Sequence, residues 1–481
     1  MGKMKSNLVA KRAFGGISRA GKAGKALACL AAMWGLHGGL EAAEGKPNII
    51  FILADDLGYG DLGSYGQTKV QTPALDQMAK EGMRFTQFYA GATVCAPSRS
   101  VLLTGLHGGH TAVRALPYHA VPPYKDGEPP IPASAPSLGT LAKDAGYSTA
   151  IIGKWGLGAV GSEGDPNKQG FELAYGYIDH GEAHNYYPKF LWRNGAKEPA
   201  SGYSHDRFTE EALKFLNTNK DKPFFIYLPY TIPHFNLNPP SVDPYAEKDW
   251  PQVGKQRAAM ITRLDRDVGR ILDELKKLGI ADNTLVLFTS DNGPTPESGA
   301  PLELFNSAGG LRGIKRDLYE GGIRVPLIAW WPGTVPSDTT SDFVGSFCDV
   351  LPTLAQVEGV PIPPGMDGVS MLPELKGKHP EQQQHTVLYW ETVEKGGAQA
   401  VRMGRWKGVL KGICSKSPGK FELYDLNTDP AEKTDLAAQH PEQVKILMEA
   451  IKKEHVTSPI FPLNVEERQA AQATNARVPS P

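Results

Sequence analysis

From residue 47 onward, continuous apolar runs alternate with amphipathic stretches. The run PNIIFILADD (residues 47–56) ends in two carboxylates, as is typical of a strand buried on both faces of a parallel sheet. A Thr-Pro pair opens a predicted helix over residues 72–82, and apolar residues at helical spacing predict another over 264–278. Further strand-like runs cover residues 147–155, 222–230, 284–293 and 325–333. The pattern predicts an α/β fold in which flanking helices cover a mostly parallel sheet.

The pattern changes near residue 365. Residues 365–380 are rich in Pro, Gly and Lys, and the segments TVLYWE, AQAVRMGRWKGVLK and FELYDL after them predict short antiparallel strands. The segment PEQVKILMEAIKKEH then predicts a helix. We therefore expect a main domain over 44–375, a small C-terminal α+β subdomain with an antiparallel sheet over 376–468, and a disordered tail over 469–481.

The first 43 residues have the order of an export signal. Seven Lys and Arg residues form a basic leader, the apolar stretch ALACLAAMWGLHGGL follows, and small residues stand at Ala42 and Ala43. We expect residues 1–43 to be a signal peptide; the cleavage site stays open, and an amphipathic anchor is the alternative. Later apolar runs are too short to span a bilayer, so we expect an exported, periplasmic or secreted protein with no stable membrane span.

Charge and cysteine content narrow the function classes. The whole chain has a net charge of −1, and without residues 1–43 it has 44 basic and 51 acidic residues, a net charge of −7. This acidic balance lacks the basic footprint of a nucleic-acid-binding protein. Without residues 1–43 the chain has three cysteines, Cys95, Cys348 and Cys414. An odd number of cysteines in an exported protein indicates that at least one thiol has a role other than an intramolecular disulfide. Pairing of Cys348 with Cys414 stays open.

Polar side chains follow the predicted strands. Asp55 and Asp56 end one strand, Asp291 and Asn292 end another, and a third leads into His234. Sites of open α/β sheets form at the carboxyl ends of strands, and Asp and Asn oxygens suit a hard cation, Ca²⁺ or Mg²⁺. Taken singly, each pair could instead cap a loop or form a turn. Together, they favour a metal site.

Cationic side chains accompany this acidic cluster. Arg99 lies one helical turn beyond Cys95, Lys154 ends a strand, and Lys315 lies in a Gly-flanked segment. A metal with these cations and His234 makes a pocket for a tetrahedral dianion, which indicates phosphate or sulfate ester hydrolysis. The alternative is that the cations are solvated surface charges.

The segment Cys95-Ala96-Pro97-Ser98-Arg99 resembles the CxPSR signature of the type I sulfatases, formylglycine-dependent and arylsulfatase-like members of the alkaline phosphatase superfamily. The resemblance extends from Asn48 to about Leu436. It includes the landmarks LADD, TGL, GKW, PH, SDNG, GxK, EGGxRVP and LYDLNTDPAEKTDL, in order. It implies an alkaline-phosphatase-like sheet in a sulfatase catalytic domain. The implied activity is hydrolysis of sulfate esters, with sulfated carbohydrates as expected substrates.

The resemblance also implies a role for each site residue. A formylglycine-generating enzyme would oxidise Cys95 to Cα-formylglycine, whose hydrated form attacks sulfur and later eliminates sulfate. Arg99, Lys154 and Lys315 would neutralise the sulfate, and His234 would protonate the departing oxygen or hydrogen-bond to it. The implied Ca²⁺ ligands are Asp55, Asp56, Asp291 and Asn292, with residue 95.

One position departs from the family pattern. The family usually has GKWHLG, whereas this chain has GKWGLG, with Gly156 in place of a histidine. His184, His180 or His205 could substitute, Gly156 could leave room for a larger substrate, or the protein could be a weak catalyst. For His184 we expect a role in substrate recognition, and the alternative is a packed loop histidine.

Two other functions compete with the sulfatase hypothesis. A phosphonate or phosphate monoester hydrolase of the same superfamily can carry CxPSR, but those enzymes tend to have His where Asn292 stands. A non-catalytic glycan-binding homologue is suggested by Gly156 alone.

Overall fold

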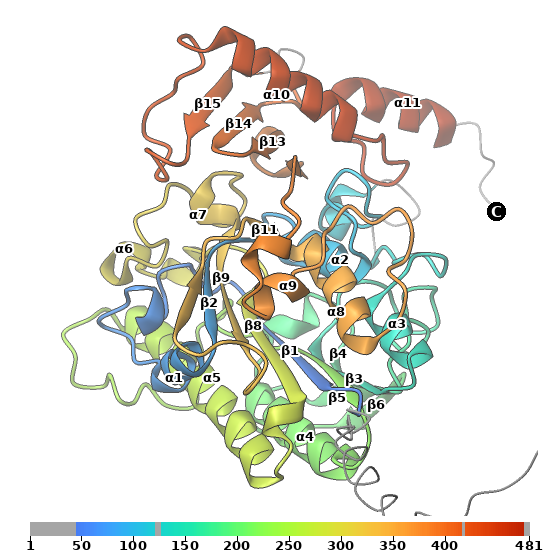
Figure 1. Ribbon diagram of the computed structural model, residues 1–481, viewed down its shortest axis with the longest axis vertical. Coiled ribbons are helices and arrows are strands. Elements are labelled where there is room, and N and C mark those ends of the chain that lie inside the picture. The colour runs from blue at the N-terminus through green and yellow to red at the C-terminus, as the bar shows by residue number, and fades with distance from the viewer. Residues whose placement is uncertain (1–44, 121–126, 416–418, 476–481) are drawn as a thin grey trace, which may run out of the picture. The chain divides into compact units, whose positions relative to one another are not determined.

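The computed structural model describes residues 45–120, 127–415 and 419–475. From Gly45 onward the chain forms one compact unit built on an eleven-stranded sheet, with a four-stranded sheet of its own near the C-terminus (Figure 1). The large sheet has the order β10 (Thr339–Ser341), β2 (Met83–Tyr89), β9 (Arg324–Trp330), β8 (Thr284–Ser290), β1 (Asn48–Ala54), β7 (Phe224–Pro229), β3 (Ser148–Lys154), β4 (Leu173–Tyr177), β5 (Phe190–Arg193) and β6 (Ala196–Pro199), and β11 (Gly345–Ser346) also pairs with β2.

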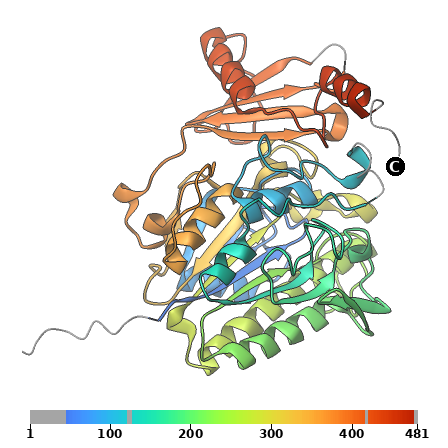
Figure 2. The same cartoon turned by 90° about the vertical axis from the view of Figure 1, so that its right-hand side faces the viewer.

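The central strands are parallel and buried on both faces. Alternate side chains of β1 point to opposite faces: Ile49 and Phe51 join one apolar cluster, and Ile50 and Ile52 join the other. One cluster packs under α2 (Cys95–Thr104), α3 (Leu138–Asp144) and α8 (Val350–Glu358), the other under α1 (Pro73–Glu81), α4 (Ser204–Asn219) and α5 (Gln252–Lys277) (Figure 2). The predicted α/β class is confirmed, although β9 runs antiparallel to both its neighbours.

The second sheet is antiparallel and follows the predicted strand segments. It consists of β12 (Leu388–Thr392), β13 (Ala398–Met403), β14 (Trp406–Lys411) and β15 (Phe421–Asp425), with α10 (Pro441–Glu454) packed on one face. Its other face contacts the large sheet, where the indole of Trp390 donates to the carbonyl of Ala90 at 2.9 Å. The small sheet therefore contacts the segment that leads to Cys95.

The C-terminal tail differs from expectation. Residues 469–475 of the expected disordered tail belong to α11 (Val465–Asn475), and residues 476–481 lie outside the described residues. The reason is local: Asn464 accepts a hydrogen bond from the backbone of Glu467 at 2.9 Å, and the Glu467 carboxylate accepts one from Leu463 at 2.8 Å. The predicted signal peptide lies outside the described residues. Among the described helices, none is both long and apolar enough to cross a bilayer.

Candidate active site

Four neighbouring parallel strands, β8, β1, β7 and β3, bring the predicted site residues to one edge of the large sheet. Asp55 follows β1, Asp291 follows β8, and Lys154 ends β3. The strand ends are joined directly, because Asp291 N–H donates to Ala54 O at 3.1 Å and Asp55 N–H donates to Ile232 O at 3.2 Å. The site is thus anchored to the most buried part of the fold.

Asp55 lies between two cations. Its Oδ2 is 2.7 Å from Lys154 Nζ and 3.3 Å from a terminal nitrogen of Arg99. Burial alone would raise the pKa of Asp55, but the charges of Lys154 and Arg99 hold it well below its usual range. Asp55 is therefore ionised.

Asp56 binds Lys315. Its Oδ2 is 2.8 Å from Lys315 Nζ and 3.3 Å from His234 Nε2, and its Oδ1 accepts from Asn292 Nδ2 at 2.6 Å. Burial raises the pKa of Asp56, and the charge of Asp55 adds to the rise, against the opposing effect of Lys315. Asp56 adopts a left-handed backbone conformation, φ 66°, which aspartate tolerates better than most residues.

Asp291 is joined to the helix that begins at Cys95. Its Oδ2 accepts from Arg99 at 2.8 Å, and its backbone oxygen accepts from the Ser98 hydroxyl at 2.5 Å. Burial raises the pKa of Asp291 to about 7, with Asp55 contributing in the same direction. Arg99 also donates to Lys154 O at 2.9 Å, so this guanidinium bridges the ends of two strands.

Cys95 is the first residue of α2 and is buried. Burial raises the pKa of its thiol, partly offset by the positive charge of Lys154. Within the described part of the chain, Cys95, Cys348 and Cys414 are all free thiols, so the open pairing of Cys348 with Cys414 is absent. Cys95 therefore lies as a buried thiol among charged groups of both signs, with Lys154 and Lys315 opposed by Asp55 and Asp291.

The acidic cluster has the chemistry of a cation site. Asp55 Oδ1 and Asn292 Oδ1 are buried and have no hydrogen-bond partner among the described residues. The Asn292 amide nitrogen donates to Asp56 Oδ1 at 2.6 Å and to Gly293 O at 2.9 Å, which orients its oxygen away from them. Buried oxygens without partners are costly, and an all-oxygen donor set fits Ca²⁺ better than zinc. The residues present therefore fit Ca²⁺.

Two stacked histidines form another side of the site. His234 Nδ1 lies 2.8 Å from Phe235 O, and its Nε2 lies 3.0 Å from Lys315 Nζ. This arrangement fits a neutral ring with the proton on Nδ1, and burial together with Lys315 lowers the pKa of His234 well below its usual value. The ring of His184 stacks on it at 4.6 Å with an interplanar angle of 8°. Burial and Lys154 lower the pKa of His184 to about 4.

The other two histidine candidates differ in position. His180 contacts the buried Glu128 through Nδ1. The Cβ of His180 lies 3.5 Å from the position that a Cβ atom would take on Gly156. His205 is fully buried on α4, with Nε2 3.1 Å from Asp267 and its ring against Tyr230. His180 thus lies beside Gly156, whereas the partners of His205 belong to the core.

Two supporting contacts were missed from the sequence. Ser98 also accepts from Gly91 N–H at 3.1 Å, so its hydroxyl ties the start of α2 to β8. Arg257 forms a buried ion pair with Asp61 at 2.7 Å, and Asp61 accepts from Gly58 N–H at 2.7 Å. The pair supports the loop after Asp56. In the sequence, Ser98 was visible only as a polar residue of the CAPSR segment, and Arg257 only as a polar residue within a helix.

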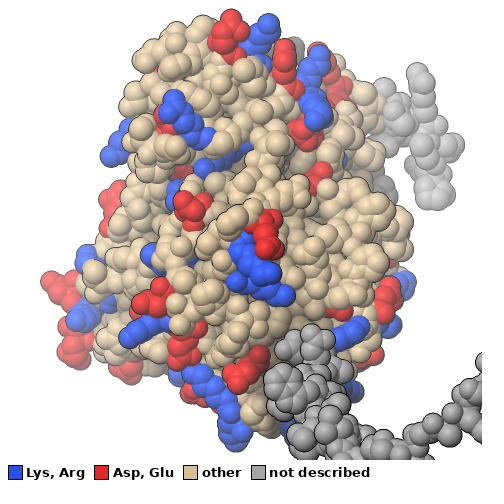
Figure 3. All heavy atoms as spheres, viewed as in Figure 1, with Lys and Arg blue, Asp and Glu red and all other residues tan. Residues whose placement is uncertain are grey.

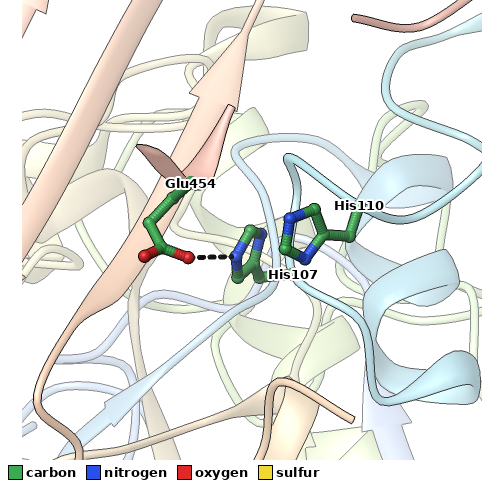
Figure 4. Close-up of side chains that lie close together, drawn as sticks. All are labelled: His107, His110 and Glu454. Atoms are coloured by element: carbon green, nitrogen blue, oxygen red, sulfur yellow. Dashed lines mark hydrogen bonds and ion pairs between the residues drawn. The ribbon is translucent and has the colours of Figure 1, made fainter. Parts of the chain in front are cut away.

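A second histidine cluster joins α10 to the loop after α2 (Figure 4). His107 Nε2 is 3.3 Å from Glu454, and His110 Nδ1 is 2.9 Å from Asp367. Gly109 N–H donates to His107 Nδ1 at 3.1 Å, which leaves the proton on the Nε2 that faces Glu454. The cluster is therefore satisfied by hydrogen bonds that tie the C-terminal helix to the main domain.

Basic and acidic side chains are interspersed on the face of the molecule in Figure 3. They are separated there by broad areas of uncharged residues. On this face the charges of the described residues form no continuous basic stripe of the kind that nucleic-acid-binding proteins present.

Comparisons with known proteins agree with this geometry. The sulfatase family model matches residues 47–360, and the model described as N-sulphoglucosamine sulphohydrolase, C-terminal, matches residues 314–457. Arylsulfatase A of Homo sapiens is 32% identical over 460 residues, covering 83% of this chain and 85% of that protein. N-acetylgalactosamine-6-O-sulfatase of Bacteroides thetaiotaomicron is 29% identical over 492 residues, covering 84% and 92%.

A solved structure gives the same result. The crystal structure of Ps i-CgsB in complex with k-i-k-neocarrahexaose superposes with a TM-score of 0.77 at 28% identity, covering 90% of this chain and 98% of that one. The chain therefore belongs to the sulfatase family, the type I sulfuric ester hydrolases of the alkaline phosphatase superfamily.

Proposed function

We propose that the protein is an exported sulfatase that hydrolyses sulfate esters of carbohydrates, using formylglycine at position 95 and Ca²⁺. The observation that carries the proposal is the surroundings of Cys95, whose thiol is acted on by two cations, Lys154 and Lys315, and by two carboxylates, Asp55 and Asp291. An anionic ester at this position would meet cations on one side and a metal site on the other.

Asp55, Asp56, Asp291 and Asn292 would hold Ca²⁺ together with residue 95. When present, the cation supplies Lewis acidity at a sulfate oxygen, and the hydrated aldehyde supplies a nucleophile that can later release sulfate by elimination. The support for this set is its all-oxygen chemistry and the two buried oxygens without partners. The all-oxygen set also favours a sulfatase over a phosphonate monoester hydrolase, because those hydrolases tend to have a histidine at the position of Asn292.

The remaining residues would act on the substrate. Lys154 and Lys315 would bind sulfate oxygens, and Arg99 would hold Asp291 while adding positive charge. Burial alone would lower the pKa of Lys315, but Asp56 raises it, so the ammonium stays charged. His234 would protonate the departing oxygen or hydrogen-bond to it; since its own proton lies on Nδ1, the Nε2 proton for this step would come from Lys315 next to it. His184 would contact the alcohol part of the ester.

His180 is the favoured substitute for the histidine that Gly156 replaces. Glu128 contacts both the Nδ1 and the backbone N–H of His180, so it orients the ring and leaves Nε2 to face other groups. His180 also lies 6.4 Å from His184, measured between ring centroids, so the three histidines form one row. His180 would then help to expel sulfate.

Sulfated carbohydrates are proposed as substrates on the names of relatives. One relative is an N-acetylgalactosamine-6-O-sulfatase, and one similar structure contains neocarrahexaose. Export through residues 1–43 and the division into a catalytic domain (44–375) and a C-terminal subdomain (376–468) belong to the same proposal. Export would bring the enzyme to such polymers outside the cytoplasm.

The first experiment is mass spectrometry of the tryptic peptide FTQFYAGATVCAPSR (residues 85–99) from protein produced with a formylglycine-generating enzyme. We expect conversion of Cys95 to the aldehyde, followed by turnover of 4-nitrophenyl sulfate that the Cys95→Ala variant lacks. A thiol that stays unmodified beside a converted control sulfatase would favour the glycan-binding alternative. Faster turnover of phosphonate monoesters would favour the hydrolase alternative.

A further inference from the structure

The loops beside the nucleophile carry a set of charged groups that the proposed chemistry does not use. Arg316 N–H donates to Thr93 O at 3.0 Å, and Thr93 precedes Cys95 by two residues. The hydroxyl of Thr93 in turn lies 3.2 Å from the hydroxyl of Thr392, at the end of β12. The turn between β12 and β13 is thereby held against the segment that leads to Cys95.

Every described cation of this region is paired with a carboxylate. The Arg316 guanidinium is 2.8 Å from Glu297 and 3.3 Å from Glu394. Lys395 is 2.7 Å from Asp317. We call the group of Glu297, Arg316, Asp317, Glu394 and Lys395 the charged rim; it contains three carboxylates and two cations.

The charged rim is connected to the sulfate-binding cations. Glu297 Oε2 is 3.8 Å from Lys315 Nζ and has no hydrogen-bond partner among the described residues. The Glu394 carboxylate lies 3.1 Å from His119 Nε2 and accepts a hydrogen bond from the hydroxyl of the half-exposed Tyr118 at 3.4 Å. Carboxylates and a guanidinium beside an exposed aromatic ring suit the hydroxyls and the apolar face of a sugar.

Strain supports a binding role for the same loops. Ser298, Arg316 and Lys395 all have positive φ, at 59°, 75° and 49°. Such conformations are unfavourable for non-glycine residues and gather at ligand-binding sites. Ser298, Arg316 and Lys395 lie on three different loops, so each loop has one residue in this conformation.

We propose that the charged rim binds the sugar ring that carries the sulfate, and that it selects rings on which this sulfate is the only negative charge. The inference rests on the proposed function. A second sulfate or a carboxylate on the ring would face Glu297 and Glu394, and no described cation of the rim is without a carboxylate partner. Like charges placed next to one another reduce affinity and exclude the wrong ligand.

The test compares N-acetylgalactosamine 6-sulfate with its 4,6-disulfate. We expect kcat/KM of the converted enzyme to be about tenfold or more higher for the monosulfate. The Glu394→Lys variant should lower this ratio by about tenfold, because it changes the charge that the second sulfate meets. The control, Glu198→Lys, makes the same change on β6 in the ion pair with Arg193 and should leave the ratio as it is.

Equal turnover of both sugars by the wild-type enzyme would overturn the inference, as would a ratio that Glu394→Lys does not change. The proposed function is measured separately, by turnover of 4-nitrophenyl sulfate. If that fails, calorimetric affinities of the Cys95→Ser protein for the two sugars still decide the inference. Tighter binding of the monosulfate supports it, and equal or weaker binding overturns it.

Discussion

The hydroxyl of Ser98 donates to the backbone oxygen of Asp291 at 2.5 Å and accepts from the backbone of Gly91 at 3.1 Å. Together with the Arg99–Asp291 ion pair, this side chain fixes the helix that begins with Cys95 against the end of β8. The distance between Cys95 and the acidic cluster therefore depends in part on Ser98, a residue outside the proposed set of metal and sulfate ligands.

Replacing Ser98 with Ala should impair turnover without preventing conversion of Cys95. The variant leaves Gly91 N–H and Asp291 O without their partner, at about 1–3 kcal/mol for each buried group. The resulting displacement of Asp291 should lower kcat by about tenfold or more. Mass spectrometry of the peptide ending at Arg99 checks conversion, and steady-state kinetics checks turnover. Full activity in the converted variant would contradict the proposed role of Ser98.

Removing Ca²⁺ should abolish activity reversibly. Chelation leaves three carboxylates near one another with only their ion pairs to Lys154, Lys315 and Arg99, so we also expect a lower melting temperature. Calcium should restore both properties. The control is Asn292→Ala, which removes one proposed oxygen ligand and should raise the calcium concentration needed for half-restoration. A chelated enzyme that stays fully active would exclude the metal site.

Replacing His184 with Ala should raise KM for the sugar substrate several-fold and change kcat less. The reason is that His184 is half-buried and stacks on His234, so its loss removes one wall of the site without removing a cation. The exposed neighbour Tyr187→Ala serves as control. Unchanged kinetics on the best substrate would rule out substrate recognition by His184.

The histidine row predicts that His180→Ala lowers kcat by about 10² or more, within the range of general acid–base catalysis. Glu128→Gln should have a smaller effect in the same direction, because it weakens the hydrogen bond that orients the ring. The His205→Gln variant is the comparison, since it perturbs the core and should mainly lower stability. If His180→Ala retains wild-type kcat, another group must replace the histidine absent at Gly156.

Stability should fall at alkaline pH through His455. The two ring nitrogens are each 2.7 Å from a carboxylate, of Glu391 and Glu467. Burial alone would lower the pKa of His455, but these two partners raise it to about 9. The stabilising contribution is therefore complete below the ordinary histidine pKa, about 6.5, and is lost as pH rises through about 9.

The measurement for His455 is the melting temperature as a function of pH. We expect a decrease of a few degrees between pH 7 and about 9.5 that is absent in His455→Gln. The exposed His440→Gln on the same C-terminal segment should keep the wild-type profile. Identical profiles for His455→Gln and wild type would refute the assignment.

The sequence alone determined the elements and the chemistry that they carry. Apolar runs such as residues 47–56 and 284–293 predict strands buried on both faces, because the interior strands of a parallel sheet are covered on both sides. The motif around Cys95 and the polar residues after the strands indicated the family and the kind of reaction. Local composition was enough for these conclusions.

Only the tertiary structure decided which groups meet. Asp55 and Asp291 are far apart in the chain, and they share a site because β1 and β8 pair in parallel. His180, His184 and His205 were the open candidates to replace the histidine absent at Gly156, yet His205 is packed in the core beside Asp267, whereas His180 and His184 form a row with His234. Ser98, Glu128 and Glu394 acquire their roles from partners on distant segments, and such contacts depend on packing that no local pattern encodes.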